Sequence, residues 1–99
     1  MTTGKRRRKA AETTASLGSD LRIGRAREVF NVLSDAGKAS TVVVDVTDVS
    51  KIDAAGVQLL AAAIVRYRTA GTVWRWHNLS PALLSAVNLL GMGDALEMK

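Results

Sequence analysis

The 99-residue sequence contains no cysteine and one histidine, His77. The absence of cysteine excludes disulfide scaffolds, thiol nucleophiles and cysteine-ligated zinc or iron–sulfur sites. One histidine is too few for a histidine-based metal cluster, so we interpret His77 as a loop residue. No apolar run approaches the ~20 residues of a membrane span, and the amino terminus lacks a signal-peptide pattern. We therefore expect one soluble, cytoplasmic domain without a metal or cofactor.

Positive charge is concentrated near the amino terminus. The net charge is +5, and residues 5–9 read KRRRK, whereas residues 10–99 hold nine basic and nine acidic side chains. Such a run attracts nucleic acid or anionic lipid through counterion release, but no aromatic residue accompanies it to stack on bases. We interpret residues 1–14 as a disordered basic tail and residues 15–99 as the folded domain, and we do not expect nucleic acid to be the main partner.

The hydrophobic pattern predicts alternating strands and helices. Two short extended pieces flank a turn at residues 18–20, and a β-branched strand is expected at residues 41–46, followed by a loop at 47–52. Helices are predicted at 26–36, at 54–69 after an Asp53 N-cap, and from a Ser80 N-cap to about Leu90; a last strand spans 72–76. The order β-β-α-β-α-β-α predicts a small α/β domain with a mostly parallel sheet packed against helices.

The expected core follows from the spacing of apolar residues in these segments. Glycines are expected to end the three helices, with Gly37 at the C′ position of the first. Trp74 and Trp76 share one face of the last strand, where they are more typical of core or interface than of ligand stacking. The predicted inward stripes of the helices are Ala26, Val29, Phe30 and Leu33; Val57, Leu60, Ala61 and Ile64; and Leu83, Leu84, Val87 and Leu90.

Three carboxylates surround the loop after the β-branched strand. Asp45, Asp48 and Asp53 are placed where α/β sheets carry their sites, and paired carboxylates there can bind magnesium or act as acid and base. The alternative that we favour is structural: Asp53 caps a helix, Asp48 forms a turn and Asp45 holds the loop backbone. No base–nucleophile partner and no glycine-rich phosphate loop accompany them, so we do not expect an enzyme.

Residues 42–60 read VVVDVTDVSKIDAAGVQLL and combine four segments in a fixed order. A hydrophobic strand that ends in Asp, a short loop, an Asp-x-x-Gly segment and an apolar helix together resemble the signature of the STAS family, the sulfate transporter and anti-sigma factor antagonist domain. Residues 74–83 resemble the last strand and helix of that family. The resemblance extends from about residue 15 to residue 97 and implies a STAS-type fold.

The resemblance also implies a function. Such domains, including small stand-alone bacterial proteins, are regulatory binding modules rather than enzymes, and the anti-sigma antagonists are switched by phosphorylation of a serine in an Asp-Ser-Ser-Gly segment. The matching positions here are Ala54 and Ala55, which carry no hydroxyl. We therefore expect no phosphorylation at the family position. Thr47 and Ser50 are the nearest hydroxyls and precede it.

The same resemblance indicates a protein partner, either an anti-sigma-type kinase or the ATPase of a phospholipid-trafficking ABC transporter. Membrane contact is then expected only through such a partner. A small-ligand module for a nucleotide or a lipid is the second class, and the oligomeric state is left open. The residues expected at the binding surface are Gly24, Arg25, Asp48, Ser50, Asp53, Ala54, Ala55, Gly56 and Gln58.

Overall fold

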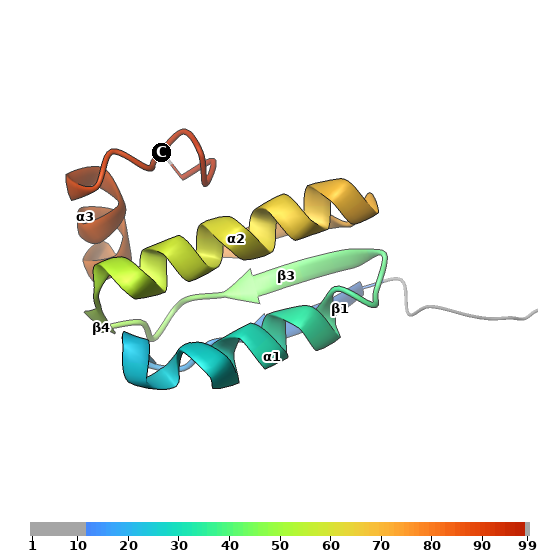
Figure 1. Cartoon of the computed structure of the whole chain (residues 1–99), viewed down its shortest axis with the longest axis horizontal. Coiled ribbons are helices and arrows are strands. Elements are labelled where there is room, and N and C mark those ends of the chain that lie inside the picture. The colour runs from blue at the N-terminus through green and yellow to red at the C-terminus, as the bar shows by residue number, and fades with distance from the viewer. Residues whose placement is uncertain (1–11, 99) are drawn as a thin grey trace, which may run out of the picture.

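The computed structural model describes residues 12–98, so residues 1–11 of the predicted tail and Lys99 lie outside the described residues. Strands and helices alternate along the chain (Figure 1). The elements are β1 (Glu12–Ser16), β2 (Asp20–Leu21), the 3-10 turn η1 (Ile23–Arg25), α1 (Ala26–Ala36), β3 (Thr41–Asp45), β4 (Lys51–Ile52), α2 (Ala54–Ala70), β5 (Val73–His77) and α3 (Pro81–Leu89).

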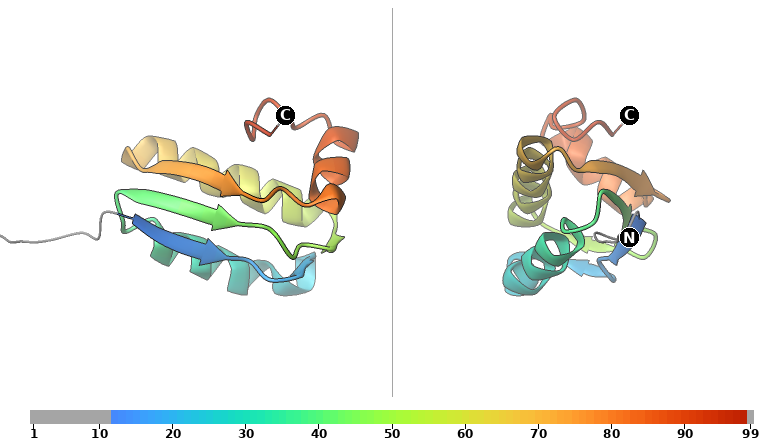
Figure 2. Two further views of the ribbon diagram at one scale, coloured as in Figure 1. Left: turned by 180° about the vertical axis from the view of Figure 1, so that it is seen from behind. Right: turned by 90° about the vertical axis from the view of Figure 1, so that its right-hand side faces the viewer.

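The main sheet is parallel and has the strand order β1-β3-β5. Helices α1 and α2 lie side by side on one of its faces, and α3 stands across the end of α2 (Figure 2). Val42 and Val44 of the central strand are completely buried beneath the two helices. This arrangement confirms the predicted α/β domain with a parallel sheet, and it brings the carboxyl ends of β1 and β3 to the same end as the start of α2.

Strands β3 and β5 lie within one residue of their predicted bounds, and two larger differences from the prediction concern β1 and β4. Strand β1 begins at Glu12, three residues before the expected start of the domain, because Thr13 and Thr14 pair with Val42 and Val43 of β3. A second difference is the short strand β4, which lies in the predicted loop at 47–52. It forms because the carbonyl oxygen of Ser19 accepts the backbone N–H groups of Ser50 and Lys51, which aligns β4 with β2.

The two long helices meet around Tyr67. Its ring is buried and its hydroxyl donates a hydrogen bond of 2.6 Å to the carbonyl oxygen of Leu33 in α1. Gly37 follows α1 with a φ of −64°, so it is not the left-handed C′ glycine that we predicted. The tyrosine ring instead leaves no room for a side chain at Gly37, because a Cβ there would lie 2.9 Å from Cε1 of Tyr67. Among the residues predicted in the inward stripes, Leu90 is exposed, and four others are only half-buried: Ala26, Phe30, Ala61 and Leu84.

The segment after α3 closes the core on the β5 side. Leu96 and Met98 are buried, and the indole N–H of Trp76 donates to the Leu96 carbonyl oxygen at 2.8 Å. The ring of Trp74 lies beneath the guanidinium of Arg68, 5.2 Å from its centroid. Both tryptophans therefore serve internal packing. Within residues 12–98, no helix combines the length and apolarity that crossing a bilayer requires.

Candidate functional site

The start of α2 is joined to the η1 turn by one carboxylate. Oδ1 of Asp53 accepts the backbone N–H of Gly56 at 2.9 Å, which confirms the predicted N-cap. Its Oδ2 accepts the backbone N–H of Ile23 at 2.9 Å. These bonds, first the one from Ile23 and then the one from Gly56, favour the ionised carboxyl group and hold the pKa of Asp53 below its ordinary value. Asp53 thus fixes the position of η1 relative to the first turn of α2.

Gly56 provides the second link between these segments. It is buried against β2, and a Cβ built on it would lie 1.8 Å from the carbonyl oxygen of Leu21. Only glycine allows the helix to start this close to the strand backbone. Gly56 was expected at the binding surface, but its burial gives it a structural part: it positions the surface rather than forming it.

The η1 turn exposes an apolar side chain between two arginines. Ile23 is 71% exposed and begins the η1 turn, whereas the sequence pattern predicted a short extended piece after residue 20. Arg22 forms a two-bonded ion pair with Asp20, with Nε–Oδ1 and Nη2–Oδ2 distances of 2.9 Å. Those hydrogen bonds lower the pKa of Asp20 to about 2. Neither Ile23 nor Arg22 stood out in the sequence, because only the 3-10 turn directs them outward.

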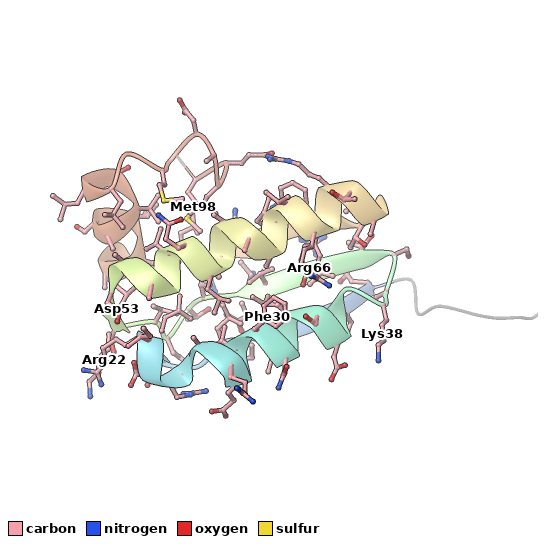
Figure 3. The ribbon with its side chains drawn as sticks, in the orientation of Figure 1. Arg22, Phe30, Lys38, Asp53, Arg66 and Met98 are labelled. Carbon is pink, nitrogen blue, oxygen red and sulfur yellow. The ribbon has the colours of Figure 1, made fainter. Side chains whose placement is uncertain are left out.

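A shallow hollow lies beside this turn. Its volume is about 470 Å³ and it is open to solvent. Asp53 and Arg22 lie together at this end of the molecule (Figure 3). Arg25 is held by an ion pair of 2.9 Å with Glu28 in the first turn of α1. The hollow is lined by Asp20, Arg22, Ile23, Gly24, Arg25 and Asp53.

The first turns of α2 continue this surface. Ala54 is exposed and Ala55 is half-buried, so the helix presents small apolar side chains next to η1. Gln58 is also exposed, and its amide Nε2 donates to the sulfur of Met92 at 3.6 Å. No residue from Asp53 to Leu60 carries a hydroxyl group. These residues therefore offer no hydroxyl oxygen as a phosphate acceptor.

The remaining candidate residues occupy the loop between β3 and β4. Asp45 accepts hydrogen bonds from the hydroxyl of Thr47 at 2.6 Å and from its backbone N–H at 3.0 Å, and these two bonds, the hydroxyl's first, lower the pKa of Asp45. This confirms its predicted part in holding the loop backbone. Asp48 and Ser50 are exposed, and the Ser50 hydroxyl approaches the Ser19 carbonyl oxygen at 3.5 Å. In the part of the chain from 12 to 98, no three His, Asp or Glu side chains are grouped as metal ligands.

The structure therefore brings together only some of the residues predicted at the binding surface. Gly24, Arg25 and Asp53 line one hollow, and Ala54 and Ala55 directly follow Asp53 on α2. We define the α2-start surface as the exposed Ile23 together with five predicted residues that are exposed or half-buried: Gly24, Arg25, Ala54, Ala55 and Gln58. Asp53 is treated separately, because its carboxylate holds the two segments together. Asp48 and Ser50 lie outside the residues that line the hollow.

Solved structures share this fold. The chain superimposes on a sulfate transporter family protein from Wolinella succinogenes with a TM-score of 0.73 and 22% identity, covering 87% of this chain and 71% of the other. The anti-sigma factor antagonist SpoIIAA in its unphosphorylated form gives a TM-score of 0.69 at 17% identity, covering 87% and 77% of the two chains. A comparison with curated proteins gave no match.

The sequence itself was also compared with models of protein families. The model of the family described as "Mlab, STAS domain" matches residues 5–98, which is nearly the whole chain. Its span includes the Asp53–Gly56 helix start and the η1 turn that Asp53 fixes to it. The chain therefore belongs to the STAS domain family, as the pattern of residues 42–60 predicted.

Proposed function

We propose that this chain is a regulatory module that binds a protein partner in the cytoplasm through the α2-start surface. The observation that carries the proposal is that Ile23 and Ala54 are both exposed, on two segments that the Asp53 carboxylate holds together. An exposed apolar side chain on a rigid support, rimmed by charged groups, is typical of a protein interface. The charged rim consists of Arg22 with Asp20 and Arg25 with Glu28.

The absence of hydroxyl groups at the helix start supports a surface that phosphorylation does not switch. A phosphate on the first turn would add a charge of about −1.5 to −2 in the middle of the surface. Ala54 and Ala55 cannot carry one. Binding is then regulated by the abundance or state of the partner rather than by modification of this segment.

Two partner classes agree with the family. An anti-sigma-type kinase is one, given the fold shared with an anti-sigma factor antagonist. An ATPase of a phospholipid-trafficking ABC transporter is the other, and the match to the family described as "Mlab, STAS domain" favours it. In both cases the chain acts by contact, and no catalytic group is required of it.

Affinity capture followed by calorimetry tests the proposal. Ala54→Glu places a carboxylate on the exposed first turn, where the helix dipole favours it, so the fold is expected to remain intact. An unpaired charge buried in an interface commonly costs 2–5 kcal/mol, so the captured partner should bind at least ~30-fold more weakly. Ala62→Glu, an identical change at another exposed position of α2, is the matched control and should bind like the wild type.

Circular dichroism must show that both variants fold. Equal affinity of wild type and Ala54→Glu, both folded, would show that the partner docks elsewhere. Weakening by both variants to the same extent would mean that charge, rather than position, governs binding.

A small-ligand module is the second candidate, because the hollow of about 470 Å³ beside Ile23 is large enough for one. Thermal-shift measurements with nucleotides and with short-chain lipids distinguish the two candidates. A ligand that binds only the folded chain raises its melting temperature by mass action. We expect no shift with either set, and a concentration-dependent shift that Arg25→Ala abolishes would favour the ligand.

A further inference from the structure

The main sheet ends at β1, which pairs with β3 on one of its sides only. The backbone N–H of Leu17, the residue after β1, donates to a carbonyl oxygen of β3 at 3.2 Å. Because backbone groups alternate in direction along a strand, those of Thr13 and Ala15 also point toward β3. The groups that point away from β3 belong to the three remaining residues of the strand: Glu12, Thr14 and Ser16.

This outer side of β1 is open to a further strand. Within residues 12–98, no backbone hydrogen bond reaches the outward N–H and C=O groups of Thr14 and Ser16. The strand also lacks the features that protect such an edge in many proteins, because its sequence ETTAS contains no proline or lysine and its register with β3 is regular. An edge of this kind binds extended peptides through main-chain hydrogen bonds.

Helix α1 places an apolar side chain beside this edge. The helix packs against β1 and extends beyond it on the side away from β3, as the left view of Figure 2 shows. The ring of Phe30 faces α2, because the guanidinium of Arg66 lies over it. Val32 follows two residues later, about 200° further around the helix, so it lies on the side of α1 away from α2. Val32 is 36% exposed and borders the outer side of β1.

The position of α1 disfavours a second copy of this chain as the occupant. Two copies joined through antiparallel β1 strands carry both α1 helices on the same face of the joint sheet. Neighbouring strands lie about 4.8 Å apart, whereas the axes of packed helices require about 8–10 Å. Because α1 lies over β1, the two helices would collide. An extended segment without a helix behind it avoids this collision.

The sequence before β1 does not favour a hairpin within the same chain. Ala10 and Ala11 directly precede Glu12, and neither is the Asn or Gly that a two-residue hairpin turn requires. A segment of another protein is therefore the occupant that the edge fits best.

We propose that the outer edge of β1 binds an extended segment of a protein partner as an additional antiparallel strand. Antiparallel pairing is the more stable arrangement per residue, and it exchanges two hydrogen bonds with each of the three outward residues. Every second side chain of the segment faces α1, where Val32 favours an apolar residue. The others lie beside the hydroxyl groups of Thr14 and Ser16. This inference goes beyond the proposed function and depends on residues outside the α2-start surface, so either can fail without the other.

The probe is a synthetic pentapeptide, acetyl-Ser-Val-Thr-Val-Lys-amide. When its threonine lies opposite Thr14, its lysine lies opposite Glu12 and its two valines face α1. Nuclear magnetic resonance follows hydrogen exchange of the single amides of the full chain at millimolar peptide concentrations. The peptide should slow exchange at Thr14 and Ser16, whereas the amides of residues 13 and 15 should already be protected by β3 in the free chain. No saturable change at Thr14 and Ser16 would overturn the proposal.

Matched controls exist on both molecules. N-methylation of the peptide's threonine removes the N–H that the Thr14 carbonyl group accepts and should weaken binding about tenfold, whereas N-methylation of its first valine, whose N–H points away from β1, should change binding less than about twofold. Val32→Ser should weaken binding about threefold. Val65→Ser, the same change at an exposed position of α2, should not weaken it. Equal weakening by the two N-methylated peptides would overturn strand pairing.

Two other occupants are outcomes of the same measurement. Protection of the Thr14 and Ser16 amides without peptide, lost when residues 1–10 are deleted, would assign the edge to the chain's own amino terminus. Protection that rises with protein concentration, together with a doubled mass in sedimentation, would assign it to a second copy. Either result would overturn the proposal. Thermal melts confirm that each variant folds.

Discussion

A Cβ atom on Gly56 would lie 1.8 Å from the carbonyl oxygen of Leu21. The first turn of α2 therefore lies directly against the backbone of β2. A clash between a Cβ and this carbonyl oxygen could not be relieved by rotating a side chain. The position of the α2-start surface depends on this close approach, because the η1 turn directly follows β2.

Gly56→Ala should therefore be strongly destabilising. Alanine gains about 1 kcal/mol of helix propensity over glycine, but separating helix from strand to admit the methyl group is expected to cost more, about 3 kcal/mol. We expect a net loss of about 2 kcal/mol, measured by urea denaturation. Gly24→Ala is the matched control, because a Cβ atom there would meet nothing within 4 Å beyond its chain neighbours. A Gly56→Ala chain as stable as Gly24→Ala would show that the α2 start adjusts freely.

Asp53 provides a test with residue-level detail. Asp53→Ala removes both hydrogen bonds and should lower the melting temperature by about 5 °C. Asp53→Asn keeps an acceptor for the Gly56 N–H but turns an amide donor toward the N–H of Ile23. Hydrogen exchange of the single amides should therefore show Ile23 deprotected in both variants and Gly56 deprotected only in Asp53→Ala. Protection of the Ile23 amide in Asp53→Asn would contradict the assigned acceptor. Asp48→Asn should leave both amides unchanged.

Local signals in the sequence correctly predicted two helix starts, the central strand and the end of α2. Asp53 and Ser80 cap their helices as predicted, because an Asp or Ser side chain that accepts a nearby N–H is specified within a few residues. The β-branched run at residues 42–44 became the buried centre of the sheet. Gly71 ends α2 with a φ of 76°, in the left-handed region that favours glycine.

Features that depend on distant contacts could not be predicted. Strands of two residues, such as β2 and β4, are too short to show any alternation, and they exist only because Ser19 meets Ser50 and Lys51 in space. The exposure of Ile23 arises from the η1 turn, which ends the alternation begun at Leu21. The role of Gly37 depends on a tyrosine thirty residues later in the chain, so a helix-ending glycine was the natural prediction.

Tyr67 gives a pH dependence that a single chromophore reports. Burial raises its pKa from 10.0 to about 12, and it is the only tyrosine in the chain. Because the folded state resists ionisation while the unfolded state ionises near pH 10, stability should be unaffected below pH 10 and should fall between pH 10 and 12. Absorbance at 295 nm should show a titration near 12 in buffer and near 10 in urea. Tyr67→Phe should lose about 1 kcal/mol at neutral pH, because the hydroxyl's hydrogen bond to the Leu33 carbonyl group is lost while that carbonyl keeps the N–H of Gly37. The stability of this variant should fall less between pH 10 and 12. A native titration near pH 10 would show that the ring is accessible.

The last prediction concerns phosphorylation at the start of α2. Incubation with an anti-sigma-type serine kinase should leave the segment from Asp53 to Gly56 unmodified, because it holds no hydroxyl group. Ala54→Ser and Ala55→Ser restore an acceptor at the helix N-terminus. If the kinase recognises this surface, mass spectrometry should find phosphate on these variants alone.

A phosphate there should leave the fold intact, since the helix dipole favours an anion, while weakening the captured partner's affinity at least ~30-fold. The nearest natural hydroxyls are already engaged: Thr47 donates to Asp45 at 2.6 Å, and Ser50 faces the Ser19 carbonyl oxygen at 3.5 Å. Thr47→Ala and Ser50→Ala should therefore bind the partner as the wild type does. Stoichiometric phosphate on Thr47 or Ser50 of the wild-type chain, with loss of partner binding, would show instead that the switch has moved into the loop before α2.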